Sequence, residues 1–278
     1  MLLVTGATGN IGRALLGEVR ARGAGWPVRG LTRDAARAAF PAGVEAVEGD
    51  LAEPESVKRA LDGVRSLFLL SRLGPDAEIL TAARAAGVEH VVLVSSITAL
   101  THPHLGPARE NLRVERLVKD SGLAWTILRP TQFASNSLMW AEAIRAGETV
   151  RAPYADTGLP TIHPADIASV ARVALTEPGH RGRTYALTGP KPVSARHQVE
   201  AVAAAVGRDV PFAEISRQEA YAQMVAVFGD EAADAVLDVT GGDVNDELLA
   251  VRDTVARITG VPARPFRQWA TENAGLFR

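Results

Sequence analysis

The stretch LLVTGATGNIGR, residues 2–13, determines how the rest of the chain is interpreted. A short apolar run ends in a turn with three evenly spaced glycines, and a helical pattern of apolar residues follows it. Gly6 permits a sharp turn, Gly9 lets the backbone approach a diphosphate, and Gly12 allows helix and strand to pack closely. Free amides at the start of the helix, around Asn10 and Ile11, then meet the negative charge of that diphosphate. We therefore predict a dinucleotide-binding turn.

Further apolar runs bounded by turn residues recur at residues 28–32, 44–49, 66–71, 90–96 and 124–130. Stretches with helical spacing separate them, at residues 11–21, 55–61, 77–86 and 109–121. Strands that read as continuous apolar runs and alternate with helices indicate a parallel sheet that is covered on both faces. The sequence therefore predicts an α/β fold with a doubly wound parallel sheet.

The pattern loosens after about residue 130 into helices with occasional strands, at residues 184–189 and 209–216, and from residue 217 onward it is mostly helical. No linker rich in Pro, Gly or Ser divides the two halves. We expect a dinucleotide-binding domain over residues 1–150 and a smaller, mainly helical substrate-binding lobe over residues 151–278. Segments of that lobe are expected to return to the sheet.

Composition excludes several classes of function. The 278 residues are 47% hydrophobic and carry a formal net charge of -2, which gives no attraction to nucleic acid or acidic lipid. The absence of cysteine excludes disulfides, thiolate zinc sites and iron–sulfur clusters. No apolar run approaches the ~18 residues of a membrane span. We expect a cytoplasmic monomer or homodimer with no metal site and no membrane segment.

The end of the second apolar run indicates which nicotinamide dinucleotide is bound. Arg33 and Asp34 stand side by side there, about 20 residues beyond Gly12, where an acid binds a ribose hydroxyl and an arginine accommodates a 2'-phosphate. Arg13 can join Arg33 in a cationic clamp around that phosphate. We favour NADPH over NADH, with the alternatives that NAD is used or that both arginines are solvated surface charges.

Other residues fall at the carboxyl ends of the predicted strands, where an open α/β sheet binds its ligand. Asp50 and Leu51 are expected at the adenine ring, Ser71 under the nicotinamide ribose, and Gln132 and Phe133 near the nicotinamide. The residues predicted to contact the cofactor are Gly6, Thr8, Gly9, Asn10, Ile11, Gly12, Arg13, Arg33, Asp50, Leu51, Ser71, Gln132 and Phe133.

Several motifs resemble the NmrA-like branch of the atypical short-chain dehydrogenase/reductase superfamily. They include TGATGNIGR at residues 5–13, VVLVSS at 91–96, SGLAWTILRPTQFASN at 121–136, IHPADIA at 162–168 and YALTGP at 185–190. Their order and spacing cover almost the whole chain. The resemblance implies a Rossmann-like NAD(P)-binding fold and, in active members, the reduction of quinones and related electrophiles.

Most catalytic members of that superfamily use a Tyr-x-x-x-Lys pair, and this chain has none. Its tyrosines, Tyr154, Tyr185 and Tyr221, are followed four residues later by Gly, Gly and Val. Reduction of a simple carbonyl develops a strongly basic alkoxide and benefits from a positioned acid. A quinone develops a delocalised, weakly basic anion, so hydride delivery needs only positioning and a few hydrogen bonds. The missing pair argues against a simple alcohol dehydrogenase.

The loop after the apolar run at residues 90–96 offers candidate side chains in place of the missing Tyr-x-x-x-Lys pair. Ser96 is a candidate hydrogen-bond donor and His104 a candidate proton donor or orienting group, although His102 and His104 also suit an exposed, proline-punctuated loop. Arg129 is expected to pair near the end of the sheet. An apolar pocket for a flat ligand is expected from Trp140, Tyr154, Met224 and Phe228, unless they are core residues.

The favoured function is an NADPH-dependent reductase that transfers hydride to a quinone or polycyclic aromatic acceptor. A non-catalytic, NAD(P)-binding redox sensor is one alternative. Reductive activation of a polycyclic aromatic for reaction with oxygen, as in a monooxygenase-type tailoring enzyme, is another.

Overall fold

The computed structural model describes residues 1–22, 25–71 and 73–278, which pack as two compact units. Unit 1 contains Met1–Ala99, Arg109–Pro130 and Pro164–Ala186. Unit 2 contains Leu100–Ala108, Thr131–His163 and Leu187–Arg278. The chain therefore passes between the units several times, whereas the sequence analysis drew one boundary at residue 150. That boundary stays a prediction.

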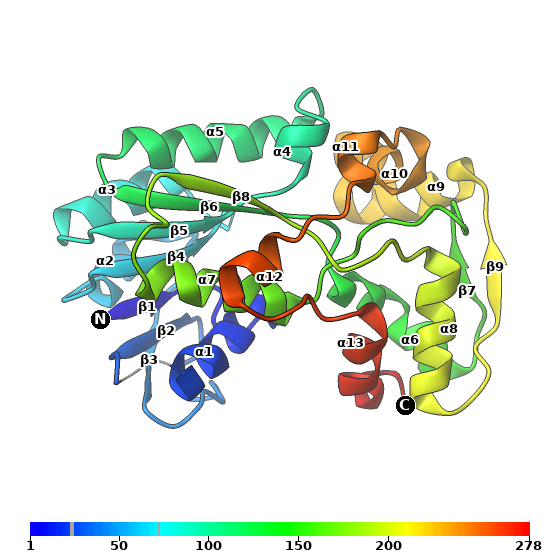
Figure 1. The fold of residues 1–278 in the computed structure, drawn as a ribbon, viewed down its shortest axis with the longest axis horizontal. Helices are drawn as coiled ribbons and strands as arrows, with labels where there is room; N and C mark the ends of the chain where they lie inside the picture. The colour runs from blue at the N-terminus through cyan, green and yellow to red at the C-terminus, as the bar shows by residue number, and fades with distance from the viewer. Residues whose placement is uncertain (23–24, 72) are drawn as a thin grey trace. The chain divides into compact units, whose positions relative to one another are not determined.

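A seven-stranded sheet organises unit 1, with the order β3-β2-β1-β4-β5-β6-β8 (Figure 1). The register makes β3, β2, β1, β4, β5 and β6 parallel neighbours. The chain order reverses between β1 and β4, which is the switch point where such sheets bind ligands. The strands are β1 (Leu2–Val4), β2 (Val28–Thr32), β3 (Val44–Glu48), β4 (Ser66–Leu70), β5 (His90–Val94), β6 (Ala124–Pro130) and β8 (Arg183–Leu187).

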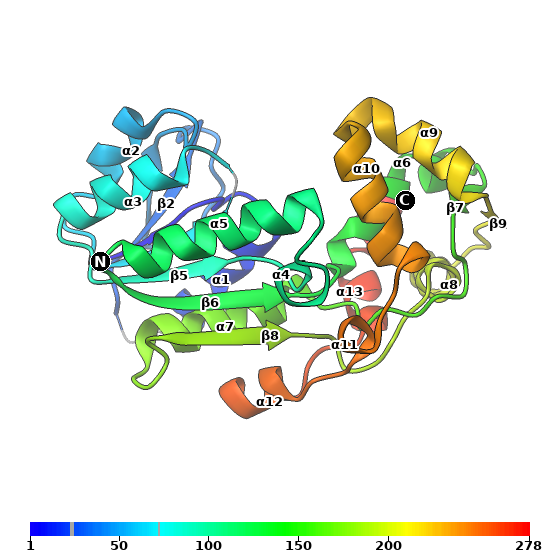
Figure 2. The same cartoon turned by 90° about the horizontal axis from the view of Figure 1, so that it is seen from above.

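Helices cover both faces of this sheet (Figures 1 and 2). One face carries α2 (Pro54–Ala60), α3 (Asp76–Ala85) and α5 (Gly106–Asp120), and the other carries α1 (Asn10–Arg22) and α7 (Pro164–Thr176). The short helix α4 (Thr98–Thr101) follows β5. The predicted doubly wound α/β fold is thus confirmed.

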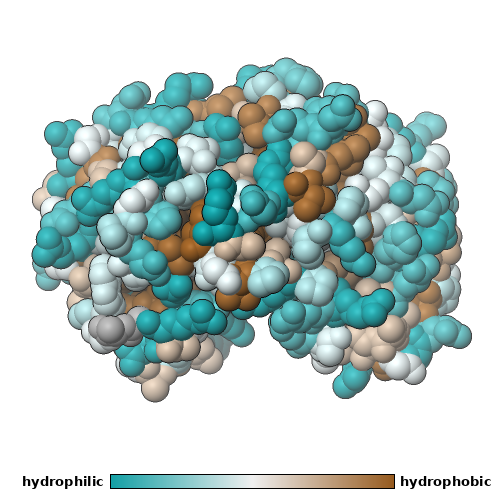
Figure 3. All heavy atoms as spheres, in the orientation of Figure 1, coloured by the Kyte–Doolittle hydropathy of each residue, from teal (hydrophilic) through white to brown (hydrophobic). Residues whose placement is uncertain are grey.

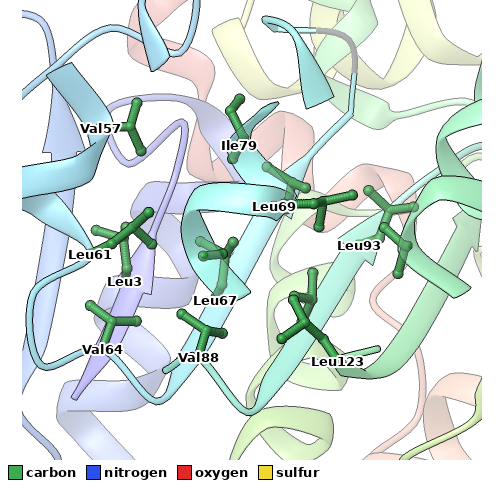
Figure 4. Close-up of a cluster of buried hydrophobic side chains, with 14 of the residues drawn as sticks. Leu3, Val57, Leu61, Val64, Leu67, Leu69, Ile79, Val88, Leu93 and Leu123 are labelled. Atoms are coloured by element: carbon green, nitrogen blue, oxygen red, sulfur yellow. The ribbon is translucent and has the colours of Figure 1, made fainter. Parts of the chain in front are cut away.

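The core of unit 1 follows from the alternation of side chains along the strands. Leu67 and Leu69 on β4 project to the same face because they are two residues apart, and Figure 4 shows them beside Leu3 and Leu93 of the neighbouring strands. All four side chains are completely buried. Each contributes roughly 1.5–3 kcal/mol relative to an exposed side chain. This packing fixes the strand ends that carry the candidate site.

Unit 2 is mainly helical, as the sequence predicts from residue 217 onward. One of its hydrophobic clusters packs α8 (Ala195–Val206) and α13 (Phe266–Glu272) around Phe266, Trp269 and Phe277. A two-stranded parallel sheet joins β7 to β9. The other elements are η1 (Ala134–Trp140), α6 (Ala141–Ala146), β7 (Val150–Ala152), α8 (Ala195–Val206), β9 (Phe212–Glu214), α9 (Arg217–Phe228), α10 (Asp230–Leu237), η2 (Asp238–Gly242), α11 (Asp246–Leu249), α12 (Thr254–Thr259), α13 (Phe266–Glu272) and η3 (Ala274–Phe277).

Polar side chains dominate the face seen in Figure 3, with apolar atoms in smaller groups between them. Among the described helices, none combines the length and the apolar character that a membrane span requires.

Candidate functional site

The turn between β1 and α1 has the geometry that its glycines predict. Gly6 has a φ of +58°, a left-handed conformation that side chains rarely adopt, and a Cβ there would also strike the Leu70 side chain. A Cβ on Gly12 would lie 2.8 Å from Ala7 Cα and would overlap the Gly6 carbonyl oxygen. Gly9 N–H donates to Gly6 O at 2.9 Å and closes the turn. The start of α1 is therefore held directly against the end of β1.

The first turn of α1 is suited to an anion. Arg13 N–H donates to Gly9 O at 2.9 Å, and the amides before it have no carbonyl four residues earlier within the helix. No acidic residue stands in this turn to neutralise the positive end of the helix dipole. Thr8, Gly9 and Asn10 are exposed, while Ile11 is buried in the core. An incoming diphosphate would therefore meet free N–H groups at an open surface.

Arg33 and Asp34, which follow β2, differ in the bonds that their side chains already make. Asp34 Oδ1 accepts the Arg37 backbone amide at 3.0 Å, and the Asp34 carboxylate pairs with the Arg37 guanidinium at 3.5 Å. Across residues 1–22, 25–71 and 73–278, Arg33 makes no hydrogen bond or ion pair, and its side chain is exposed. Arg13 is also exposed and reaches only Thr8 O, at 3.4 Å. The two arginines remain available to a phosphate.

Hydrogen bonds hold the loop after β3. Asp50 Oδ1 accepts the Ala52 amide at 2.9 Å, and the Asp50 amide donates to Ser56 Oγ at 2.8 Å. Leu51 is only 7% exposed because its side chain joins the unit 1 core. Gly74, after β4, lies so close that a Cβ there would overlap the Leu51 carbonyl. The predicted adenine contacts of Asp50 and Leu51 stay predictions.

Ser71 follows β4 and contacts a residue that the sequence analysis missed. Its Oγ lies 3.0 Å from Val94 O, at the end of β5, and 3.2 Å from Asn111 Oδ1 on α5. Asn111 is 5% exposed. The signal was present in the sequence, because Asn111 is a polar residue on the face of a helix that also buries Val114 and Val118.

One turn further along α5, a buried carboxylate is fully engaged. Glu115 is 1% exposed, and Arg129 donates to its two oxygens at 2.8 and 2.6 Å. Ser95 Oγ donates to the same carboxylate at 2.7 Å. The expectation that Arg129 pairs near the end of the sheet therefore holds, with Glu115 as its partner. This cluster ties β5, β6 and α5 together.

Ser96 keeps a hydrogen available. Its Oγ accepts from the Thr98 amide at 3.2 Å and from Thr98 Oγ1 at 2.9 Å, so neither contact uses the Ser96 hydroxyl hydrogen. The residue is half-buried, directly after the end of β5. Its predicted role as a hydrogen-bond donor stays a prediction.

The two loop histidines belong to unit 2 and differ in burial. His102 is 1% exposed, and its Nδ1 and Nε2 lie 2.8 Å from Thr101 Oγ1 and 2.6 Å from Asp243 O. His104 is exposed, with its ring 6.0 Å from that of His102. His102 is therefore structural, and the predicted catalytic role of His104 stays a prediction.

The segment after β6 is also part of unit 2. Gln132 Oε1 accepts from Thr161 Oγ1 at 3.1 Å, Gln132 O accepts the Ile162 amide at 2.8 Å, and Phe133 forms a β-bridge with Ile162. Both Gln132 and Phe133 are half-buried. Their predicted contacts with the nicotinamide stay predictions.

The proposed pocket residues do not form one group. Trp140 packs against the cluster around Trp269, whereas Tyr154 and Met224 pack against Leu237, and Phe228 is 54% exposed. Core packing therefore accounts for Trp140, Tyr154 and Met224. Within the described residues, no group of three or more His, Asp or Glu side chains is arranged to hold a metal ion.

Comparison with known proteins shows which family the sequence matches. A family model described as NAD(P)H-binding matches residues 6–178. A (4-alkanoyl-5-oxo-2,5-dihydrofuran-3-yl)methyl phosphate reductase of Streptomyces griseus is 39% identical over 283 residues, covering 100% of this chain and 99% of the relative. An NAD(P)H azoreductase of Xenophilus azovorans is 36% identical, with the same coverage of both chains.

A solved structure agrees over the full length. The NADPH-dependent quinone oxidoreductase 2 of Escherichia coli has a TM-score of 0.79 and 26% identity, with 100% of both chains covered, and a structure of the same protein has been solved with NADPH. These matches confirm the expected NmrA-like resemblance, the Rossmann-like fold, the NAD(P)H cofactor and the oxidoreductase class.

Proposed function

The chain belongs to the NAD(P)H-binding family, and from that premise we propose that it is an NADPH-dependent reductase of conjugated acceptors, with quinones and polycyclic aromatics as the first class to test. The absence of any Tyr-x-x-x-Lys pair in the sequence carries this proposal. When bound, NADPH supplies a hydride. The chain itself must bind the cofactor, orient the acceptor and stabilise the charge that develops.

The residues proposed to bind the diphosphate and the 2'-phosphate stand in unit 1. The first amides of α1 would take the diphosphate, and the exposed Arg13 and Arg33 would take the 2'-phosphate. Asp34 competes less well for a ribose hydroxyl because its Oδ1 already accepts the Arg37 backbone amide. This difference supports NADPH over NADH.

The residues for chemistry supply hydrogen bonds more readily than protons. Ser96 has a free hydroxyl hydrogen, and a hydroxyl of ordinary acidity stabilises a delocalised anion better than it protonates an alkoxide. Glu115, the buried carboxylate of α5, is already bonded by Arg129 through two oxygens. Both facts favour acceptors whose reduction gives a weakly basic anion.

The relatives support the same class of acceptor. The names of three of them specify a furanone, an azo compound and a quinone. In each of these groups the double bond that takes up hydride is conjugated with an electron-withdrawing partner, so the resulting negative charge is spread over several atoms. A positioned strong acid is less important for such acceptors.

The test is anaerobic loss of NADPH absorbance with a panel of benzoquinones, naphthoquinones, polycyclic quinones, azo dyes and a 2,5-dihydrofuran-5-one. Saturated ketones of similar size are the matched negative substrates. We expect turnover with conjugated acceptors and none with the saturated ketones. Ser96→Ala is expected to lower kcat by about 10-fold or more while leaving the NADPH Kd unchanged.

Two outcomes would overturn the proposal. Preferential reduction of saturated ketones would show that an efficient acid is present after all. Tight NADPH binding without turnover of any acceptor would instead favour a non-catalytic redox sensor, which would bind NADPH and NADP with unequal affinity.

A further inference from the structure

The loop between β2 and β3, residues 33–43, carries Arg33 at its start and one large apolar side chain, Phe40, near its end. Its other apolar residues are alanine and proline. Between Arg33 and Phe40 the loop makes a turn in which Asp34 Oδ1 accepts the Arg37 amide at 3.0 Å. Any large apolar anchor for this loop must therefore come from Phe40.

Gly30 leaves a space in the middle of β2, and the ring of Phe40 fills it. Leu31 belongs to the buried cluster of Leu3, so Gly30, one residue earlier, faces the opposite side of the sheet, which carries α1. A Cβ on Gly30 would lie 2.6 Å from Phe40 Cε2 and 3.2 Å from Ala7 Cβ. The ring thus takes the place of a missing side chain, beside the glycine turn, and a larger residue at position 30 would displace it.

The far end of the loop is also fixed. Gly43 has a φ of +81°, and a Cβ there would lie 2.6 Å from Arg20 Nη2 on α1. The Val44 amide, at the start of β3, donates to Pro41 O at 3.1 Å. Docking of Phe40 on β2 therefore shortens the stretch that can move to residues 33–39.

This order matters for Arg33, whose exposed side chain makes no hydrogen bond or ion pair in the part of the chain that the structure describes. Ordering a loop at the moment of binding costs free energy, and ordering it beforehand lowers that cost. A guanidinium that is already close to its binding position can form its paired hydrogen bonds to a phosphate at a smaller loss of entropy. Only a ligand that carries the phosphate gains from this.

We infer that Phe40, seated on Gly30, is a positioning residue that sets the preference for NADPH over NADH by ordering the loop of Arg33 before the cofactor binds. The inference rests on the proposed function, because it requires Arg33 to meet the 2'-phosphate. NADH has a hydroxyl in place of that phosphate, so its affinity does not depend on the order of this loop.

The experiment measures Kd values for NADPH and NADH on single and double variants. Phe40→Ala removes the anchor, and Gly30→Ala displaces it while the ring is kept. Both changes are repeated in an Arg33→Ala background. Phe212→Ala is the matched control, because Phe212 is also half-buried, lies under the Arg196 guanidinium at 5.2 Å and belongs to unit 2.

We expect Phe40→Ala and Gly30→Ala to raise the NADPH Kd by about 3- to 10-fold and to leave the NADH Kd unchanged. Without the guanidinium of Arg33, neither change should alter the NADPH Kd further, because the two sites act as a unit. Hydrogen exchange of the amides of residues 33–39 should speed up in Phe40→Ala. Phe212→Ala should lower thermal stability and change neither Kd.

Three results would overturn the inference. They are equal weakening of NADPH and NADH by Phe40→Ala, no weakening of either, or an undiminished effect of Phe40→Ala in the Arg33→Ala background. Failure of the unmodified protein to bind NADPH would instead refute the proposed function.

Discussion

Replacing Gly12 with alanine tests the glycine turn directly, because the new methyl group has no free space. Its Cβ would lie 2.8 Å from Ala7 Cα and from the Gly6 carbonyl carbon. Both are backbone atoms, so no rotamer change relieves the contact, and α1 must move away from the end of β1. Overpacking of this kind lowers the free energy of unfolding by about 1–3 kcal/mol.

The same helix supplies the matched control. Gly17 lies mid-helix, and a Cβ there would meet no atom within 4 Å. Gly17→Ala should therefore raise the free energy of unfolding by about 0.5–1 kcal/mol, the usual gain when alanine replaces glycine within a helix. Since 1 kcal/mol shifts Tm by about 2–4 °C in a chain approaching this size, the variants should melt several degrees apart, on opposite sides of the unmodified protein.

Measuring the NADPH Kd distinguishes a local change in the glycine turn from a change in overall stability. Movement of α1 displaces the amides that are proposed to bind the diphosphate, so Gly12→Ala should raise the NADPH Kd about 10-fold or more. Gly17→Ala should leave it unchanged. Thermal melts and NADPH fluorescence titrations measure both effects. Gly12→Ala with unchanged Tm and unchanged Kd would refute the view that the close contact at Gly12 sets the position of α1.

Three further predictions follow from particular side chains. Arg33→Ala should raise the Kd of NADPH about 10-fold or more and leave that of NADH unchanged, whereas Arg37→Ala should disturb neither; equal effects on both cofactors would contradict the 2'-phosphate role. Burial, with smaller contributions from nearby positive groups, lowers the pKa of His90 from 6.5 to about 4. Between pH 4 and pH 6.5 the folded state therefore binds fewer protons than the unfolded state. The free energy of unfolding should fall by up to about 3 kcal/mol as pH drops from 6.5 to 4, and denaturant melts of a His90→Gln variant should show a smaller fall. Arg129→Met should lower stability by about 3–5 kcal/mol because Glu115 is left as a buried charge, and Glu115→Leu in the same protein should restore most of that loss; no rescue would show that packing matters more than charge.

The strand and helix pattern of unit 1 could be predicted because buried parallel strands have a simple sequence signature. Each of the predicted runs at residues 28–32, 66–71 and 90–96 overlaps a strand of the sheet. The path of the chain between the units could not be predicted. It depends on contacts between residues far apart in sequence, such as the bond from Thr131 N to Leu187 O at 2.9 Å, which no local pattern encodes.

The cofactor turn was predictable for a different reason. A Cβ at Gly6 or Gly12 would overlap neighbouring atoms, so only glycine fits at these positions. Their roles could therefore be predicted from the glycine spacing alone. The aromatic residues offered no such information. Trp140 suits a core and a pocket equally well by composition, and only its three-dimensional packing against the Trp269 cluster distinguishes the two.

The buried face of α5 carries two residues with the spacing of the missing Tyr-x-x-x-Lys pair, and their chemistry bears on the proposed reaction. Asn111 and Glu115 are four residues apart, the spacing of a Tyr-x-x-x-Lys pair, and both point inward because i and i+4 share a helix face. Arg129 occupies both oxygens of Glu115, so that residue stabilises the sheet and is not available to a substrate. Asn111 bonds Ser71 through its Oδ1, and an amide only forms hydrogen bonds and does not release a proton. This face therefore offers no proton donor for an alkoxide, which agrees with the proposed preference for acceptors that delocalise the charge themselves.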